Sequence, residues 1–407
     1  MKRIISLILI ISILFPIYCF ADEENVEEEE QVPELVEAVS ESAEEPNINS
    51  RSAIIYDRNS KEVIYGKEEN TRRKMASTTK IMTCMVVLEK GELTDTVIVS
   101  KKAAGTGGSR VGLKTGDKVS VQDLLYGLML CSGNDAAVAL AEHVGGSVEG
   151  FADLMNEKAR QLNLSNTHFV TPHGLDNEEH YTTAYELAIM ADYALKNNNF
   201  SSIVGTKNIT ININGNPRNL SNTNELLGSF EGIYGVKTGF TNGANRCLVT
   251  SCKREKLDII TIVLGADTKK FRTQDSVKLI NYAMNIYKDI NIENKIQSEF
   301  EIWEKQNNIK VNKGEKADLK IELDELHYKY ITIKNTQEND IKTEFDSIKK
   351  IEAPCQKGTV VGALKISVEG KTKLIVNIQC AETIQRKNVL NYMEELLKKS
   401  FNFNITK

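Results

Sequence analysis

Residues 75–91 read MASTTKIMTCMVVLEKG, a short polar run followed by an apolar stretch that ends at a glycine. The apolar stretch has almost no polar interruption, which is typical of a helix buried on every side, and Gly91 is a typical helix stop. Lys80 lies at the start of this helix, three residues after Ser77. An ammonium group at the mouth of an apolar segment is either an ordinary solvated charge or a group whose pKa is strongly perturbed.

Two more motifs of small polar residues occur later in the chain. Ser132-Gly133-Asn134 interrupts two helices predicted within 121–144, and Lys237-Thr238-Gly239 ends an apolar strand. Single copies carry little information, because the chain contains a second copy of each motif. The second copies are Ser347 to Lys350, Lys114-Thr115-Gly116 and Ser400 to Asn402. The first set differs from them in its order, its structural setting and its confinement to one region.

Strand patterns flank a helical middle between residues 49 and 290. SAIIYD and EVIYG predict a hairpin, and GIYGVKTGF, CLVTSCK and LDIITIVLGA predict adjacent antiparallel strands. FADLMNEKARQL and TAYELAIMADYALKN have the period of amphipathic helices, and 273–288 returns to helix. We therefore expect an α/β (α+β) domain over 49–290, with an antiparallel sheet flanked by helices and a helical subdomain.

The C-terminal third has a different pattern. Short strand segments separated by glycine and charged turns predict a small all-β domain over 295–383. Residues 386–403 form a basic amphipathic helix, which either lies in a membrane surface or packs back on its own domain. Its apolar face consists of Val389, Met393, Leu396, Leu397 and Phe401.

The N-terminus resembles an export sequence. Lys2 and Arg3 precede an apolar run, and small residues follow near Ala21, which predicts a signal peptide over 1–21. A lipid-modified Cys19 and an uncleaved anchor are the alternatives. Residues 22–48 are acidic and predict a disordered spacer, so we expect a secreted, extracytoplasmic protein attached peripherally to the outer face of the membrane.

Composition excludes some classes of function. The net charge is −5 and the isoelectric point is about 5.8, and no basic stripe suggests a nucleic-acid partner. His168, His173 and His180 lack the spacing of a metal site, so we expect no metal and no cofactor. The cysteines after Cys19 lie in apolar runs, which favours buried thiols over disulfides but does not decide between them.

The three motifs in this order mark the penicillin-recognising serine enzymes. The stretches LSNTHFVTPHGLD, CSGNDAAVALAEHVGGSVEGFADLMN and GVKTGFTNGANRCLVTS extend the likeness. The chain resembles the low-molecular-mass penicillin-binding proteins, the D-alanyl-D-alanine carboxypeptidases, over about 49–290. IEAPCQKGTVVGALKI resembles their β-rich C-terminal domain, and the terminal helix resembles their membrane anchor. The resemblance implies a β-lactamase/transpeptidase-like fold.

Ser77 and Lys80 are the expected nucleophile and base. Residues three apart on a helix are neighbours, so the Lys80 amine can reach the Ser77 hydroxyl. A serine hydroxyl is a poor nucleophile until a base removes its proton. Lys80 can serve if its pKa falls, and both burial against the apolar helix and the like charge of Lys237 lower it.

The remaining site residues follow from the motifs and the resemblance. Ser132 is expected to relay a proton between Lys80 and the leaving amine, and Asn134 to hold Lys80 and the substrate amide. Lys237 supplies positive charge toward a substrate carboxylate, with the Thr238 hydroxyl beside it.

Gly239 lets a peptide approach the strand edge. The backbone N–H groups of Ser77 and Phe240 form the implied oxyanion hole. Arg272 matches the family arginine that receives the terminal carboxylate of D-alanine, and a surface ion pair is the alternative role for this residue. Phe240 stands where several relatives have histidine, and Asn245-Arg246 replaces a small-then-aromatic pair, which affects substrate preference and deacylation.

The resemblance implies a serine D-Ala-D-Ala carboxypeptidase that trims peptidoglycan stem peptides through an acyl-enzyme and is inhibited by β-lactam antibiotics. A β-lactamase is one alternative, although no dedicated deacylating glutamate is identifiable. A transpeptidase or endopeptidase on the same scaffold is another. A wall-binding scaffold protein is the alternative from outside the enzymes, and the intact motif set argues against it.

Overall fold

The computed structural model describes residues 44–255 and 257–402, which form two compact units. The first unit contains the residues up to Tyr56 together with Val63–Ala283, and the second contains Asp57–Glu62 and the residues from Met284 onward. The predicted signal peptide and most of the predicted acidic spacer lie outside the described residues.

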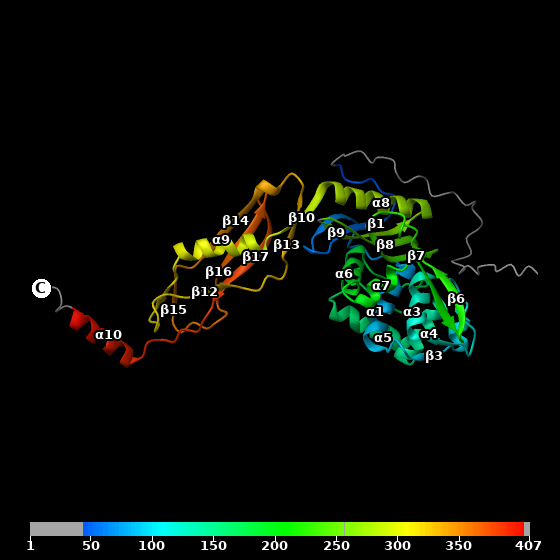
Figure 1. Cartoon of the computed structure of the whole chain (residues 1–407), viewed down its shortest axis with the longest axis horizontal. Coiled ribbons are helices and arrows are strands. Elements are labelled where there is room, and N and C mark those ends of the chain that lie inside the picture. Colours follow the sequence, from blue (N-terminus) through cyan, green and yellow to red (C-terminus); the bar gives the residue numbers. More distant parts are fainter. Residues whose placement is uncertain (1–43, 256, 403–407) are drawn as a thin grey trace, which may run out of the picture. The chain divides into compact units, whose positions relative to one another are not determined.

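A five-stranded sheet in the order β2-β1-β9-β8-β7 forms the centre of the first unit (Figure 1). Its strands come from both ends of this unit, as the sequence predicts. They are β1 Ser52–Asp57, β2 Val63–Lys67, β7 Ile233–Thr241, β8 Asn245–Arg254 and β9 Leu257–Ala266. The pairs β1–β2, β7–β8 and β8–β9 are antiparallel. The predicted fold class is therefore confirmed, and β7, which carries Lys237, is an edge strand of this sheet.

Helices cover both faces of this sheet. Figure 1 shows α8 on one side and the other helices of the unit on the opposite side. The helices are α1 Lys80–Lys90, α2 Lys101–Ala104, α3 Val121–Leu130, α4 Asn134–Gly145, α5 Val148–Gln161, α6 Ala184–Ala194, α7 Asn198–Val204 and α8 Lys269–Ile286. Hydroxyl side chains cap four of them. Ser100, Ser120, Ser147 and Thr183 accept hydrogen bonds from backbone N–H groups in the first turns of α2, α3, α5 and α6.

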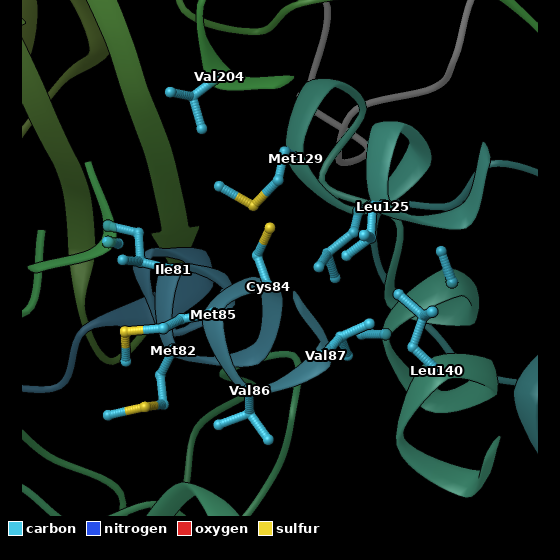
Figure 2. Close-up of a cluster of buried hydrophobic side chains, with 14 of the residues drawn as sticks. Ile81, Met82, Cys84, Met85, Val86, Val87, Leu125, Met129, Leu140 and Val204 are labelled. Carbon is cyan, nitrogen blue, oxygen red and sulfur yellow. The ribbon is translucent and has the colours of Figure 1, made fainter. Parts of the chain in front are cut away.

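Helix α1 lies in the middle of the helical layer. Its residues from Lys80 to Val87 are all buried, which agrees with the prediction of a helix enclosed on every side. Figure 2 shows Cys84 and Val87 of α1 among side chains of α3, α4 and α7. Leu125, Met129, Leu140 and Val204 belong to the same core cluster. The position of Lys80 is therefore fixed by a close-packed core.

Two short antiparallel strand pairs complete the first unit and were not predicted. β3 (Thr96–Ile98) pairs with β4 (Lys118–Ser120), and β5 (Asn208–Ile213) pairs with β6 (Asn216–Ser221). Asn214 and Gly215 join the second pair, and both have positive φ, as the tight turns of β-hairpins require.

The second unit is rich in β structure, as predicted, and contains a four-stranded sheet in the order β12-β17-β16-β14. These strands are β12 Ile321–Leu323, β14 Ile341–Ser347, β16 Val360–Val368 and β17 Lys371–Cys380. Two smaller pairs accompany them. They are β10 Tyr287–Asn291 with β13 Tyr330–Lys334, and β11 Lys310–Asn312 with β15 Lys350–Glu352. A 3-10 turn, η2, covers Glu338–Asp340.

A helix that the sequence analysis missed, α9 (Glu293–Gln306), belongs to this unit. It buries Ile296 and Phe300 in the core of the domain. The Trp303 ring stacks on the Phe345 ring, with centroids 4.9 Å apart and an interplanar angle of 4°. The helix has few apolar residues, so its pattern is weak in the sequence.

The last helix, α10 (Val389–Asn402), has exposed apolar side chains. Val389, Met393, Leu396 and Leu397, all members of the predicted apolar face, are between 55% and 74% exposed. Among the residues that the structure describes, no helix is both long enough and apolar enough to span a bilayer.

The cysteines of both units are buried, and none of them forms a disulfide among the described residues, which agrees with the favoured interpretation. They are Cys84, Cys131, Cys247, Cys252, Cys355 and Cys380.

Candidate active site

The Ser77–Lys80 pair lies where a 3-10 turn, η1 (Ala76–Thr79), continues into α1. Side chains three apart eclipse one another in a 3-10 turn, which aligns the two residues more closely than an α-helix would. The Lys80 Nζ lies 2.9 Å from the Ser77 Oγ. Lys80 is fully buried, whereas Ser77 is partly exposed, so the hydroxyl is accessible to a substrate while its base is not.

Two acceptor oxygens besides Ser77 Oγ also lie within hydrogen-bond distance of the Lys80 amine. Its Nζ lies 2.7 Å from Asn134 Oδ1 and 3.0 Å from the backbone oxygen of His173. Asn134 Nδ2 donates to the Gly107 carbonyl at 2.7 Å, and this bond turns the Asn134 oxygen toward Lys80. A neutral amine that donates to these two acceptors retains a lone pair for the Ser77 proton.

Ser132 and Asn134 lie in the predicted break between α3 and α4. Ser132 has a φ of 60°, in the left-handed region, and its buried Oγ has no hydrogen-bond partner among the described residues. The expected Ser132–Lys80 contact is thus not a direct hydrogen bond in this structure. The backbone N–H of Asn134 donates to Ser109, and that of Gly133 to Gly127, so the break is held firmly.

The carboxylate of Asp135 braces the segment that faces this break. It accepts hydrogen bonds from the backbone N–H groups of Val111, Gly112 and Leu113 at 2.9 to 3.0 Å, and it is fully buried. Asp135 therefore fixes the segment 111–113 beside the site and makes no hydrogen bond to Ser77 or Lys80.

Strand β7 passes directly beside η1 at Gly239. A Cβ at this glycine would lie 3.1 Å from the Ser77 backbone nitrogen and 3.2 Å from that of Thr78. A side chain at position 239 would therefore crowd Ser77. Glycine is needed here for this close approach as well as for the approach of a peptide to the strand edge, which the sequence predicts. Lys237, on the same strand, is 1% exposed and donates to the Thr238 carbonyl at 3.1 Å.

Phe240 continues β7 and packs under Arg246 of β8. The Arg246 guanidinium carbon lies 3.7 Å from the centre of the Phe240 ring, a cation–π contact. Two of the three residues that depart from the family pattern therefore contact each other in the structure.

A loop between α5 and α6 supports the Ser77 turn through two histidines that the sequence analysis did not place in the site. His180 Nδ1 accepts from the Val170 N–H at 3.0 Å, so the proton of the neutral ring is on Nε2, 2.8 Å from Thr79 Oγ1. The Thr79 hydroxyl in turn donates to the Ala76 carbonyl at 2.7 Å. Protonation would place a second proton on Nδ1, against the Val170 donor.

Burial keeps both histidines neutral. It lowers the pKa of His173 to about 3. It lowers the pKa of His180 to about 4, where the charge of His168 adds to the shift. The sequence did not indicate that these two histidines support the site. His173 contacts Lys80 through its backbone oxygen, which any residue type could supply.

Arg272, near the start of α8, is buried and bound to Glu225. Its Nη2 donates to Glu225 Oε1 at 2.7 Å. Burial lowers the pKa of Arg272, and Glu225 opposes that shift. The segment that carries Glu225 also reaches β7, since the Thr223 and Thr238 hydroxyls lie 2.7 Å apart. Thr223 and Glu225 were not identified from the sequence.

This geometry is typical of a class of serine enzymes in which a buried lysine, rather than a histidine, lies beside the serine hydroxyl. A sequence model described as D-alanyl-D-alanine carboxypeptidase matches residues 39–268. A second model, described as the C-terminal domain of penicillin-binding protein 5, matches residues 298–386. The chain belongs to the D-alanyl-D-alanine carboxypeptidase family.

Individual relatives agree with this assignment. D-alanyl-D-alanine carboxypeptidase DacF of Bacillus subtilis is 33% identical over 354 residues, which cover 86% of this chain and 89% of the relative. DacA of Escherichia coli is 32% identical, with 80% and 81% covered. The crystal structure of penicillin-binding protein 5 from Haemophilus influenzae aligns with a TM-score of 0.73 at 29% identity, covering 84% of this chain and 99% of that one.

One solved relative is described by a different reaction. A Streptomyces DD-transpeptidase aligns with a TM-score of 0.57 at 37% identity and covers 59% of this chain and 98% of that one. The long matches to carboxypeptidases cover both units, whereas this alignment covers a shorter part of the chain. The protein is a serine-type D-Ala-D-Ala carboxypeptidase of the penicillin-binding protein type.

Proposed function

We propose that this protein removes the terminal D-alanine from peptidoglycan stem peptides through an acyl-enzyme on Ser77, with Lys80 as the base. The observation that carries the assignment is the environment of the Lys80 amine. Its nitrogen lies 2.9 Å from the Ser77 oxygen, and two obligate acceptors, Asn134 Oδ1 and the His173 carbonyl, also face it. Burial disfavours an ammonium group there and favours the neutral amine that a general base requires.

The reaction then proceeds in two halves. The Ser77 oxygen attacks the carbonyl carbon of the penultimate D-alanine while Lys80 accepts the hydroxyl proton. The C–N bond breaks, and the proton passes through the Ser132 hydroxyl to the amine of the departing D-alanine. Water then attacks the carbonyl carbon of the Ser77 ester and gives a proton to Lys80. The bond from this carbon to the Ser77 oxygen breaks, Lys80 returns the proton to that oxygen, and the shortened peptide is released.

The edge strand β7 is the proposed binding surface for the peptide. Its open edge permits the substrate to add as a further strand. The backbone N–H groups of Ser77 and Phe240 stabilise the oxyanion, and Lys237, the Thr238 hydroxyl and Arg272 attract the terminal carboxylate. A β-lactam acylates Ser77 in the same way, but its leaving group stays tethered to the acyl group, so hydrolysis is slow.

A kinetic comparison tests this proposal. Purified protein should release D-alanine from a pentapeptide ending in D-Ala-D-Ala and should be labelled by fluorescent penicillin. Ser77→Ala should abolish both activities, and Ser400→Ala, which alters a second-copy motif, is the matched control. Unchanged D-alanine release by Ser77→Ala would refute the assignment. Rapid turnover of penicillin would instead indicate a β-lactamase.

We also propose that the enzyme is exported and attached to the outer face of the membrane. The signal peptide 1–21 directs export, the acidic spacer 22–48 precedes the catalytic domain 49–290, and the β-rich domain 295–383 leads to the helix 386–403. The exposed apolar side chains of α10 support attachment, since such a face lies favourably at a bilayer surface.

Deletion of the residues after 385 tests the attachment. The truncated protein should move from the membrane fraction to the soluble fraction and should retain D-alanine release. An unchanged distribution would mean that α10 does not attach the enzyme.

A further inference from the structure

Neighbouring residues accept hydrogen bonds from only some of the N–H donors of the Arg272 guanidinium. Nη2 donates to Glu225 Oε1 at 2.7 Å and lies 3.3 Å from Thr273 Oγ1. Nε is buried and has no hydrogen-bond partner in the described part of the chain. The side chain is 6% exposed, so packing fixes its orientation. Arg272 is therefore a buried cation that has one resident carboxylate and at least one unused donor.

Glu225 is itself held in place by several contacts. Thr273 Oγ1 donates to Glu225 Oε1 at 2.8 Å, and Lys269 Nζ lies 3.2 Å from Oε2. The preceding residue, Asn224, is buried and donates to the Gly235 carbonyl at 3.2 Å, which ties this segment to β7. Glu225 cannot move away from Arg272 without breaking these bonds.

The charges in this cluster favour an ionised Glu225. Burial alone would raise the pKa of Glu225, but the charge of Arg272, the Thr273 hydroxyl and the charge of Lys269 outweigh burial and hold that pKa below its usual value. Arg246 adds another positive charge close to Arg272. The cluster thus holds three cations and one carboxylate, which leaves positive charge for a second carboxylate.

We propose that Glu225 is a specificity-determining residue that acts as the resident counter-ion of Arg272 and weakens the binding of the substrate's terminal carboxylate. The inference rests on the proposed function, in which Arg272 attracts that carboxylate. A carboxylate attracted to the Arg272 guanidinium would lie within a few ångströms of Glu225, and like charges at that separation repel. Glu225 therefore limits affinity for peptides that end in a free carboxylate.

An orienting role for Glu225 predicts the opposite result. If Glu225 served mainly to orient Arg272, its removal would raise KM. The burial of Arg272 argues against this, because packing already restricts the side chain. Glu225→Gln separates the two roles, since glutamine keeps an oxygen for Arg272 Nη2 and Thr273 but removes the negative charge.

The experiment compares wild-type protein and Glu225→Gln on two peptides, one ending in D-Ala-D-Ala and the same peptide with a C-terminal amide. We expect Glu225→Gln to lower KM for the acid by about tenfold, the effect of removing one like charge at short range, and to leave KM for the amide and both kcat values unchanged. Glu231→Gln is the matched control, because it removes the same charge from an exposed position of the same segment. It should behave as wild type.

The outcomes separate the two proposals. An unchanged or raised KM for the acid in Glu225→Gln, with wild-type protein active, overturns the role of Glu225 and leaves the proposed function intact. An equal fall in KM for acid and amide overturns it as well, because the effect would not depend on the carboxylate. Absence of D-alanine release by wild-type protein overturns the proposed function and this inference together.

Discussion

Acidification should destabilise the catalytic domain through two buried histidines, His173 and His180. Both rings have a pKa near 6.5 when solvated, and burial lowers these values to about 3 and about 4. Below pH 6.5 the unfolded chain binds protons that the folded chain excludes. The stability that comes from folding with both rings neutral is therefore fully present above pH 6.5, and it is lost as the pH falls from 6.5 toward the folded pKa values.

The loss of stability depends on how far the pH falls below 6.5, the pKa of the solvated rings. Each histidine lowers the free energy of unfolding by about 1.4 kcal/mol for every pH unit below 6.5, as long as its ring stays neutral in the folded state. Lowering the pH from 7 to 5 therefore removes about 2 kcal/mol for each ring and about 4 kcal/mol in total. A loss of this size is a large fraction of the stability of a typical domain.

Urea unfolding at pH 7 and pH 5, followed by far-ultraviolet circular dichroism, measures the effect. His180→Asn removes the titrating ring and keeps an acceptor for the Val170 N–H, so its loss between the two pH values should be about 2 kcal/mol smaller than in wild type. His327→Asn is the control, because His327 is exposed. An equal loss in wild type and His180→Asn would refute the argument that burial holds this ring neutral.

Three further substitutions have defined outcomes. Gly174→Ala would place a Cβ 2.0 Å from the Ala76 carbonyl at a φ of +87°, so penicillin acylation should fall by about 10² or more in a stopped-flow assay. Asp135→Ala leaves three backbone N–H groups without their acceptor and should lower the free energy of unfolding by about 3 kcal/mol or more in urea titrations. Phe300→Ala should destabilise the second unit by about 3–5 kcal/mol in urea titrations followed by Trp303 fluorescence, with D-alanine release unchanged.

The local part of the site could be predicted because it depends on short sequence separations. Ser77 and Lys80 are three residues apart, so the turn geometry alone brings them together. The apolar run after Lys80 predicted the burial that the structure shows, and the break at Ser132 was visible between two helical patterns. By contrast, α9 was missed, because few of its residues enter the core and its periodicity is therefore weak.

The distant contacts could not be predicted from residue types. The oxygen that faces Lys80 from His173 belongs to the backbone, and 93 residues separate the two positions. Glu225 contacts Arg272 across 47 residues, and its sequence neighbourhood looks like an ordinary polar loop. Such contacts depend on how loops pack against the sheet, which short patterns do not encode.

The sequence by itself determined which residues we propose to carry the chemistry, because Ser77 and Lys80 are neighbours on one turn and the apolar helix around Lys80 makes its charge unfavourable. Only the tertiary structure decided how that chemistry is supported. The acceptors around Lys80, the neutral histidines beneath the Ser77 turn and the counter-ion of Arg272 come from segments that meet only when the helices and the sheet pack, since hydrogen bonds and ion pairs act over a few ångströms whatever the separation along the chain.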